Sequence, residues 1–594
     1  MKTMKYINKV SALALVSVLA FSSCADLFEP APENLHDLDY MKGDANFASG
    51  VLGNAYRLMP YASEPGSDLA TDDAVSADLS SNYVRMATGS WSSQMDPVSQ
   101  WRDRYNAIEY INAFLERVDD VHFTADPNQQ ILFNHLFKGD AYGMRAIQLF
   151  FAVRAHAGMV DGQMMGTPIM THFLDATSDC NIPRNTLKEC IDSIFSDINK
   201  AMKYLPTEYK DINSFNELPE EDRNLVEGTQ AVPGDYTAAY GKHMMGKVNK
   251  SILRAFRAQV KLWAASPAFA QYTGVTMKEA AEAAAEVIGN KDVVAGGLEY
   301  WKLEATSLES GVNGPESIWQ SNPENRTSHE ANFFPPSADG KGLCNPTQNL
   351  VDAFYTTDGF PITDSRSCYD AANPYANRDK RLAAYIVLNG DKMGGKTINT
   401  TTDDKNNVDG LNQTPGTSTR TGYYMKKGLH PDVNLQLNTQ QKTYDVRIRW
   451  TELFLAYAEA ANEAEGIGPN KAAKLTVCRK TAKDVMKQIR ERAGICVGVE
   501  DPYLNECAAS PEKMRELIRN ERRLELCFEN HRFYDLRRWG ANLNEAATGM
   551  KISNGTYEKI ASVEARKYEP YMQFGPIPYT EIMKYDALKQ NQGW

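Results

Sequence analysis

Three glutamates near the C-terminus have the spacing that carbohydrate hydrolysis would need. Glu521, Glu525 and Glu529 are four residues apart, so one face of a predicted helix would present all three. Two carboxylates about 5 Å apart can act as nucleophile and acid in a retaining glycosidase. Like charges four residues apart oppose a helix unless cations neutralise them. The same segment supplies four such cations, so the pattern favours a structural ion network over a catalytic pair: Arg519, Arg522, Arg523 and Arg532.

A phosphate-binding pattern occurs in the middle of the chain. Residues 390–397 (GDKMGGKT) match G-x-x-x-x-G-K-[ST]. That chemistry requires a helix that begins at the Lys-Thr pair, because its first backbone amides hold the phosphate. The next residues, 398–404 (INTTTDD), are β-branched and polar and do not predict a helix. We therefore interpret the segment as a glycine turn between two strands.

The other polar motifs predict neither a metal nor a cofactor. No two of the nine histidines lie closer than 13 residues, so no local zinc pair exists. Residues 403–410 (DDKNNVDG) are acidic enough for calcium but lack the EF-hand order and its terminal glutamate, which favours a solvated loop. Ser510 opens a Ser-x-x-Lys pattern, but Pro511 beside it marks the serine as a helix N-cap.

The composition restricts the possible partners. The 594 residues carry a formal net charge of −12, which argues against nucleic acid and against adhesion to anionic lipid. Eight of the nine cysteines follow residue 100, and none belongs to a C-x-x-C pair. A chain of this length needs no disulfide framework, so isolated thiols are favoured. A bridge between Cys496 and Cys507 stays open.

The N-terminus reads as an export signal that ends at a cysteine. A basic start precedes an uncharged run of 12 residues, Val10–Phe21, which is too short to span a bilayer. Cys24 follows directly after two serines, and the whole resembles a bacterial lipoprotein signal. The resemblance implies that residues 1–23 are removed, that Cys24 carries acyl chains, and that residues 24–40 form a tether. An ordinary signal peptide with a free cysteine is the alternative.

The elements that must position the polar residues are mainly helices. Seven segments have helical periodicity, alanine-rich composition or cap signals: residues 101–115, 131–158, 191–205, 253–263, 276–289, 450–465 and 510–530.

Long irregular stretches separate these helices. Residues 207–247 and 304–445 are rich in Gly, Asn, Thr, Pro and Asp, with a strand-like run at 383–388. An irregular region of such length inside a compact domain is usually functional. The layout is mostly α, with paired helices and one large loop-rich lobe. Helix pairs in series suggest a tetratricopeptide-like array, although no clean 34-residue repeat is present.

The C-terminal block carries a family resemblance. Residues 519–540 (RNERRLELCFENHRFYDLRRWG) look like the signature of the SusD/RagB family of surface lipoproteins, with Asn530 where glycine is usual. The ending, 574–582 (FGPIPYTEI) with 590–594 (QNQGW), resembles the close of that family, with Gln592 replacing Pro. Further blocks in the order of the family extend the resemblance over nearly the whole chain: residues 138–150, 345–359 and 449–460 (RWTELFLAYAEA).

This resemblance implies a fold and a function. Residues 41–594 would form one SusD-like domain with four tetratricopeptide-like helix pairs, about 41–300 and 446–540, against a loop-rich lobe, about 301–445. Residues 541–594 would be a C-terminal family segment. The protein would sit on the outer face of the outer membrane. There it would capture an oligosaccharide and deliver it to a SusC-like TonB-dependent porin, without catalysis.

Sugar rings stack on aromatic rings, and their hydroxyls need a few aimed polar groups. Such sites favour aromatics carried on loops. Seven residues are candidates for contact with a ligand: Tyr83, Trp91, Trp319, Asn325, Arg326, Phe333 and Phe334. The alternative for each is that its side chain only packs inside the protein. Trp319 also fits the pattern of a buried strand.

Three rival functions stay open. A peptide-capturing protein of the same family, a secreted glycoside hydrolase and a protein-binding scaffold would each fit part of the sequence. The identity of the ligand is not readable from the residues.

Overall fold

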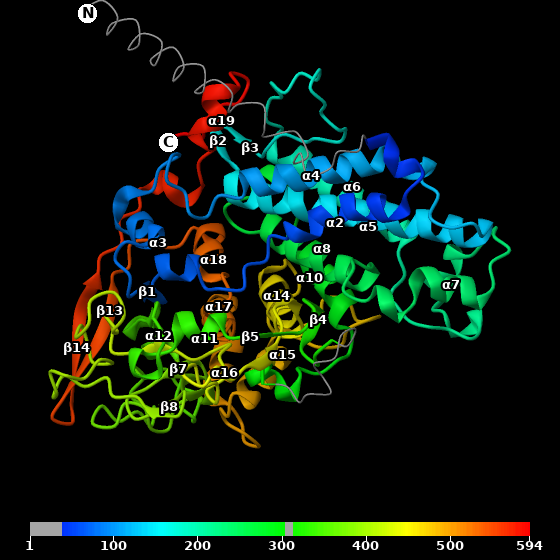
Figure 1. Cartoon of the computed structure of the whole chain (residues 1–594). Helices are drawn as coiled ribbons and strands as arrows, with labels where there is room; N and C mark the ends of the chain where they lie inside the picture. The colour runs from blue at the N-terminus through cyan, green and yellow to red at the C-terminus, as the bar shows by residue number, and fades with distance from the viewer. Residues whose placement is uncertain (1–37, 303–312) are drawn as a thin grey trace, which may run out of the picture.

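The computed structural model describes residues 38–302 and 313–594. The expected signal peptide, Cys24 and most of the expected tether lie outside this part of the chain. The described part is mostly helical, with a helical array on one side and a lobe of loops and short strands on the other (Figure 1). The predicted fold class is confirmed.

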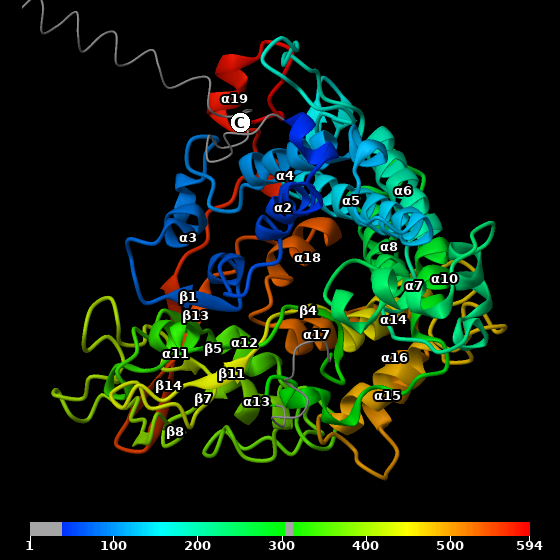
Figure 2. The same ribbon diagram turned by 45° about the vertical axis from the view of Figure 1, so that its right-hand side comes forward.

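The helical array is a continuous series in which each long helix packs against the next. Figures 1 and 2 show it running from the blue helices through the green ones to the yellow α14 and the orange α17. Its members are α2 (Ala45–Arg57), α4 (Trp101–Leu115), α5 (Pro127–His156), α6 (Leu187–Tyr204), α8 (Lys250–Ala264), α10 (Met277–Ile288), α14 (Trp450–Glu463) and α17 (Pro511–Leu526).

The remaining helices are shorter. They are α3 (Asn82–Arg85), α7 (Pro233–Tyr240), α9 (Ala270–Thr273), α11 (Ser328–Phe333), α12 (Gln348–Ala353), α13 (Lys380–Tyr385), α15 (Ala482–Arg492), α16 (Pro502–Ala508), α18 (Arg532–Trp539) and α19 (Tyr579–Lys584).

Local signals in the sequence account for the helix ends. Thr186 caps α6 in a capping box with Glu189, and Ser510 caps α17 by accepting from the Lys513 amide. Gly289 ends α10 with a φ of 54°, a conformation that glycine adopts without steric cost. The cap at Ser510 and the end at Gly289 were predicted correctly, because they depend on neighbours within four residues.

The strands pair as seven two-stranded antiparallel sheets in the described residues. The pairs are β1 (Ala74–Ser76) with β6 (Cys344–Pro346), β2 (Gly158–Val160) with β3 (Gln163–Met165), β4 (Ser317–Gln320) with β12 (Val446–Arg449), β5 (Glu324–Arg326) with β11 (Gln441–Thr443), β7 (Ile386–Val387) with β10 (Tyr424–Met425), β8 (Lys392–Met393) with β9 (Lys396–Thr397), and β13 (Ala547–Ser553) with β14 (Thr556–Glu564).

Two predictions from the sequence concern segments of the loop-rich lobe, residues 390–397 and 383–388. The phosphate-loop match forms the β8–β9 hairpin, whose turn residues Gly394 and Gly395 have positive φ, so the predicted glycine turn is confirmed. The strand predicted over 383–388 is wrong in its first half. Asp379 caps a helix there, and α13 continues to Tyr385 before the short strand β7 begins.

The C-terminal segment closes back on the helical array. The Pro576 carbonyl lies 2.6 Å from His156 Nδ1 at the end of α5. Asn591 accepts from Arg184 at 2.8 Å and donates to the His156 carbonyl. These bonds join the last residues of the chain to the end of α5 and to the loop before α6, which lie more than 400 residues earlier in the sequence.

The β13 strand docks on the lobe through a close backbone approach that we expect only glycine to allow. A Cβ at Gly422 would lie 2.2 Å from the Met550 carbonyl oxygen, and the φ of Gly422 is +90°. Gly422→Ala should lower the free energy of unfolding by about 1–2 kcal/mol for the left-handed backbone, plus about 1–3 kcal/mol for the clash. Denaturant titration of the purified variant measures the loss.

Gly416→Ala is the matched control, because Gly416 has a φ of +87° with no atom within 4 Å of its Cβ position. Gly416→Ala should lower the free energy of unfolding only by the part that comes from the left-handed backbone. Equal losses in the two variants would contradict the proposed close contact.

Candidate ligand-binding site

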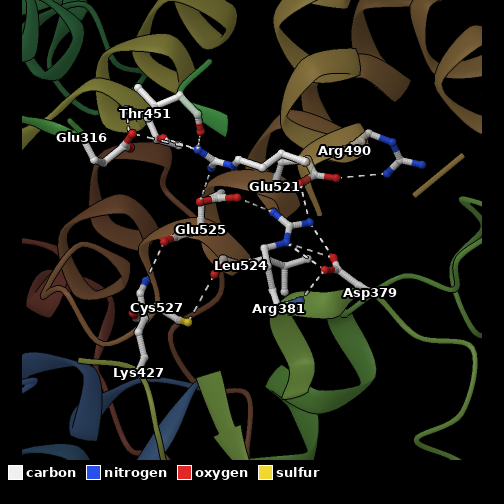
Figure 3. Close-up of polar contacts among 12 residues, drawn as sticks. Glu316, Asp379, Arg381, Lys427, Thr451, Arg490, Glu521, Leu524, Glu525 and Cys527 are labelled. Carbon is white, nitrogen blue, oxygen red and sulfur yellow. Dashed lines mark hydrogen bonds and ion pairs between the residues drawn. The ribbon is translucent and has the colours of Figure 1, made fainter. Parts of the chain in front are cut away.

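Glu521 and Glu525 of α17 lie in a buried ion cluster (Figure 3). Glu521 pairs with Arg490 at 3.0 Å and with Arg381 at 2.8 Å. Glu525 pairs with Arg381 at 3.0 Å and with Arg492 at 2.9 Å. The glutamates belong to a structural ion network, as predicted, but the predicted cations are wrong. Arginines of α13, α15 and β12 neutralise Glu521 and Glu525 in place of the interleaved ones.

The arginines interleaved with these glutamates face other elements. Arg522 pairs with Asp535, Arg523 with Asp73, and Arg532 with Asp72, whereas Arg519 lies over the Trp539 ring. Successive residues on a helix point about 100° apart, so neighbours in sequence meet different partners.

Glu529 does not share the helix face that its spacing predicted. Helix α17 ends at Leu526, and the chain then turns through Phe528 and Asn530, which have φ of 63° and 61°. The turn directs Glu529 toward Lys427 and Arg449. Asn530 fits where glycine is usual because asparagine tolerates the left-handed conformation.

Electrostatics exclude Glu525 and Glu529 as proton donors at neutral pH. Burial would raise the pKa of Glu525, but Arg492, Arg381 and Arg449 more than offset it and lower the pKa to about 2. Burial would also raise the pKa of Glu529, but Arg449 and Lys427 outweigh it and lower that pKa to about 2. A glycosidase acid needs a raised pKa, so these carboxylates are arranged as charges that hold structure.

The main cleft lies between the helical array and the lobe and has a volume of about 250 Å³. The loop after α2, the end of α5, the β11–β12 segment and the residues after α17 all contribute to its wall. Four tyrosines that line it are partly exposed: Tyr61, Tyr83, Tyr300 and Tyr534. Rings of this kind, with a flat apolar face and a polar tip, suit a ligand with both C–H faces and hydroxyls.

Polar side chains on the cleft wall are held by specific bonds. Arg326 donates to Asp445 at 2.8 Å, and Gln259 donates to Glu452 at 2.7 Å. The buried Tyr61 hydroxyl has no hydrogen-bond partner among the described residues. The cleft therefore offers ordered polar groups and aromatic faces. The described residues contain no group of three or more potential metal ligands.

Comparisons with known proteins agree over most of the chain. The model of the SusD family matches residues 315–594, and the model described as "Starch-binding associating with outer membrane" matches residues 45–217. The SusD-like protein P38 of Formosa agariphila is 23% identical over 589 residues, covering 94% of this chain and 96% of that protein. The chain belongs to the SusD family.

Solved structures of SusD-like proteins share the fold. A SusD-like protein from Bacteroides fragilis superposes with a TM-score of 0.71 at 22% identity, covering 95% of this chain and all of that one. A SusD-like carbohydrate-binding protein from the same organism gives 0.67 at 18% identity, covering 92% and 100%. A laminarin-binding SusD-like protein gives 0.54 at 17% identity, covering 92% and 99%.

Three of the residues predicted from sequence line the cleft of this SusD-family chain: Tyr83, Arg326 and Phe333. Tyr83 is partly exposed, whereas Phe333 is 3% exposed. Their contact with a ligand stays a prediction. Asn325 is exposed on β5 opposite Lys442 and does not line the cleft.

The other three predicted residues are packed in the interior, which corrects the expectation that loops present them. Trp91 is 4% exposed and donates to Asp96, with Phe533 against its ring. Trp319 is 1% exposed in β4, and Phe334 is fully buried. Their rings were placed by apolar burial and offer no open face to a ligand.

Sequence reasoning missed Tyr61, Tyr300, Tyr534, Arg154 and Arg447, which all line the cleft. Tyr534 belongs to the family signature at 519–540, so that motif held a usable signal. The others carry no local signal, because the cleft brings them together from separate parts of the chain.

The ion cluster predicts a pH-dependent loss of stability. Glu525→Gln should lower the free energy of unfolding by about 3–5 kcal/mol at pH 7, because it leaves buried arginines uncompensated. The pKa of Glu525 falls from 4.5 to about 2 on folding. Its contribution is therefore complete above pH 4.5 and is lost as the pH falls toward 2. Denaturation curves should show a smaller difference in the free energy of unfolding between wild type and variant at pH 3 than at pH 7.

Glu516→Gln provides the control, since Glu516 is an exposed residue of the same helix. It should change stability by less than about 0.5 kcal/mol. If the loss in free energy of unfolding caused by Glu525→Gln is the same at pH 7 and at pH 3, the result would be evidence against the ion cluster.

Proposed function

We propose that this SusD-family chain is a non-catalytic, surface-exposed lipoprotein that captures oligosaccharides and delivers them to a SusC-like TonB-dependent porin. Family membership supports the proposal. So do the names of relatives, one described as carbohydrate-binding and one as laminarin-binding. The matching model described as "Starch-binding associating with outer membrane" supports both the ligand class and the location.

The cleft is the observation that carries the proposal. Its four partly exposed tyrosines can stack on the flat C–H faces of sugar rings. Its ordered polar groups can bond to hydroxyls at defined positions. The buried, ion-paired Glu521 and Glu525 lie away from such a ligand and serve the fold instead.

A lipid on Cys24 is the proposed attachment, with residues 24–40 as the tether. Among the helices of the described chain, none combines the length and apolarity needed to cross a bilayer. Several acyl chains hold a protein stably, at about 0.8 kcal/mol per buried methylene. The helical repeats, lobe and C-terminal segment would then form one body outside the membrane.

Cys24→Ala should release the protein from the membrane fraction. The acyl chains need the Cys24 sulfur, and without them the proposed anchor is lost. Fractionation of cells that express the wild type and the variant, followed by blotting, measures the distribution. Conservative replacement of the exposed Cys368 is the control and should leave the protein with the membrane. Equal retention of the Cys24→Ala protein would contradict a lipid anchor at this residue.

Glycan capture predicts that cleft tyrosines carry affinity. Tyr83→Ala and Tyr300→Ala should each weaken binding of the best glycan by about 1–3 kcal/mol, by analogy with ring stacking on bases. A glycan array identifies the ligand, and calorimetry with the full-length protein in detergent measures the change. Tyr579→Ala is the control, because Tyr579 is 42% exposed and lies outside the cleft.

Other outcomes would point to the rival functions. Sugar release from polysaccharide by the pure protein would indicate a hydrolase. Binding of peptides but no glycan would indicate peptide capture. A protein that co-purifies with the porin but binds neither would be a scaffold. Each of these results would overturn glycan capture.

A further inference from the structure

The cleft is basic although the chain is acidic. The chain has a formal net charge of −12. The cleft wall reverses that balance, because seven of its side chains are basic and four are acidic: Arg154, Arg326, Lys427, Arg447, Arg449, Arg522 and Arg538 against Asp445, Glu452, Glu529 and Asp535. A cleft lined by an excess of one charge focuses the field on what enters it.

Five of the seven cations are already neutralised by neighbours. Asp445 pairs with Arg326, Glu529 with Lys427 and Arg449, and Asp535 with Arg522 and Arg538. The fourth acid, Glu452, accepts from Gln259 and lies 3.9 Å from His531. Arg154 and Arg447 remain without a carboxylate at ion-pair distance in residues 38–302 and 313–594.

Arg154 lies between two aromatic rings and has one unsatisfied donor. Its guanidinium lies 4.3 Å from the centre of the Phe151 ring and 3.9 Å from the centre of the Tyr534 ring. Its Nε is buried without a hydrogen-bond partner in the described structure, whereas another part of the guanidinium interacts with the Tyr534 hydroxyl and acts to lower the pKa of that tyrosine. Stacked rings fix the plane of a guanidinium but do not use its N–H donors.

Arg447 is held in a similar way from the β12 strand. Its guanidinium lies 4.8 Å from the centre of the Trp319 ring, which is itself packed in the interior. Burial lowers the pKa of Arg447, and the nearby Tyr56, Tyr61 and Asp445 partly offset this. A partly buried cation that lacks a counter-ion is costly to the fold unless a ligand supplies one.

The two arginines converge on Tyr61. Burial raises the pKa of Tyr61 and Glu452 raises it further, while Arg447 and Arg154 both act to lower it. Arg154, Arg447 and Tyr61 all line the cleft, although the Tyr61 hydroxyl itself is buried. Two planar guanidinium donors on the wall of one cleft match the oxygens of a carboxylate or a sulfate.

We propose that the cleft selects acidic glycans over neutral ones, binding their carboxylate or sulfate groups through Arg154 and Arg447. This selection rests on the glycan capture proposed above and specifies its substrate class. The aromatic faces stack on the sugar rings, and the two arginines bind a negatively charged group carried by one of those rings.

Calorimetry with matched oligosaccharides tests this selection. Oligogalacturonate is compared with its methyl ester, and carrageenan oligosaccharides with their desulfated form, so the pairs separate carboxylate from sulfate recognition. Alginate, chondroitin sulfate, malto- and laminari-oligosaccharides complete the panel. The full-length protein in detergent is titrated at low and at high salt. The tightest ligand should be acidic, at least about tenfold tighter than its neutral counterpart and weakened by salt.

Variants connect the preference to the two residues. Arg154→Gln and Arg447→Gln should each weaken the acidic ligand about tenfold or more and change neutral ligands little. Arg447→Lys keeps the charge and should retain more of the preference than Arg447→Gln. Arg102→Gln is the control, because the Arg102 side chain is 74% exposed on α4 outside the cleft. Thermal unfolding checks that each variant is folded.

The outcomes separate the two proposals. A neutral tightest ligand would overturn charge selection and leave glycan capture intact. Acidic binding that survives both glutamine variants unchanged would also overturn it. If no glycan in the panel or on the array binds the wild type, glycan capture fails and charge selection fails with it.

Discussion

Buried charge pairing through α17 holds the two halves of the molecule in position. Glu521 and Glu525 join this central helix to Arg381 of the lobe and to Arg490 and Arg492 of α15. Desolvating such charges is costly, and only complete pairing repays it. The lobe therefore has one favourable position against the helical array, the position in which each buried carboxylate meets its arginine.

The cleft follows from that alignment. Beyond α17 the chain turns through Phe528 and Asn530, and Glu529 ties the turn to Lys427 of the lobe and to Arg449. The early segment joins from the other side, where Asp72 pairs with Arg523 and Arg532. Loops that would otherwise move independently are thereby held around one hollow. The site can be preorganised although loops supply much of its wall.

The arginines near the cleft fall into two groups, those with a carboxylate partner and those without one. Most arginines near the cleft have carboxylate partners, and removing either member would leave a buried charge alone. Arg154 and Arg447 instead lie against aromatic rings, and neither has a carboxylate at ion-pair distance among the described residues. An acidic protein with a locally basic cleft is suited to draw a polyanion to one place and to repel it elsewhere. Family membership supports the proposed role in glycan capture, and these two residues are the reason to expect a particular class of sugar.

Much of the fold was predictable because its signals are local. Apolar periodicity located α4 at residues 101–115, and Ser510 with Pro511 located the start of α17. The β-branched and polar residues 398–404 argued against a phosphate loop for the same reason, and the glycine turn predicted in its place is present between β8 and β9. The long motif at 519–540 supplied the family, which the comparisons then showed.

The amino-acid sequence by itself determined most of the long helices, the caps at Ser510 and Gly289, the glycine turn at 394–395 and the family, since each depends on residues that are close along the chain. Only the tertiary structure decided which arginine neutralises which glutamate and which rings stay open. Arg381 meets Glu525 across 144 residues, and Trp91 is buried by Phe533 from the opposite end of the chain. Burial and ion pairing are set by segments that become neighbours only on folding, so residue type and spacing could not separate the buried tryptophans from the tyrosines that line the cleft.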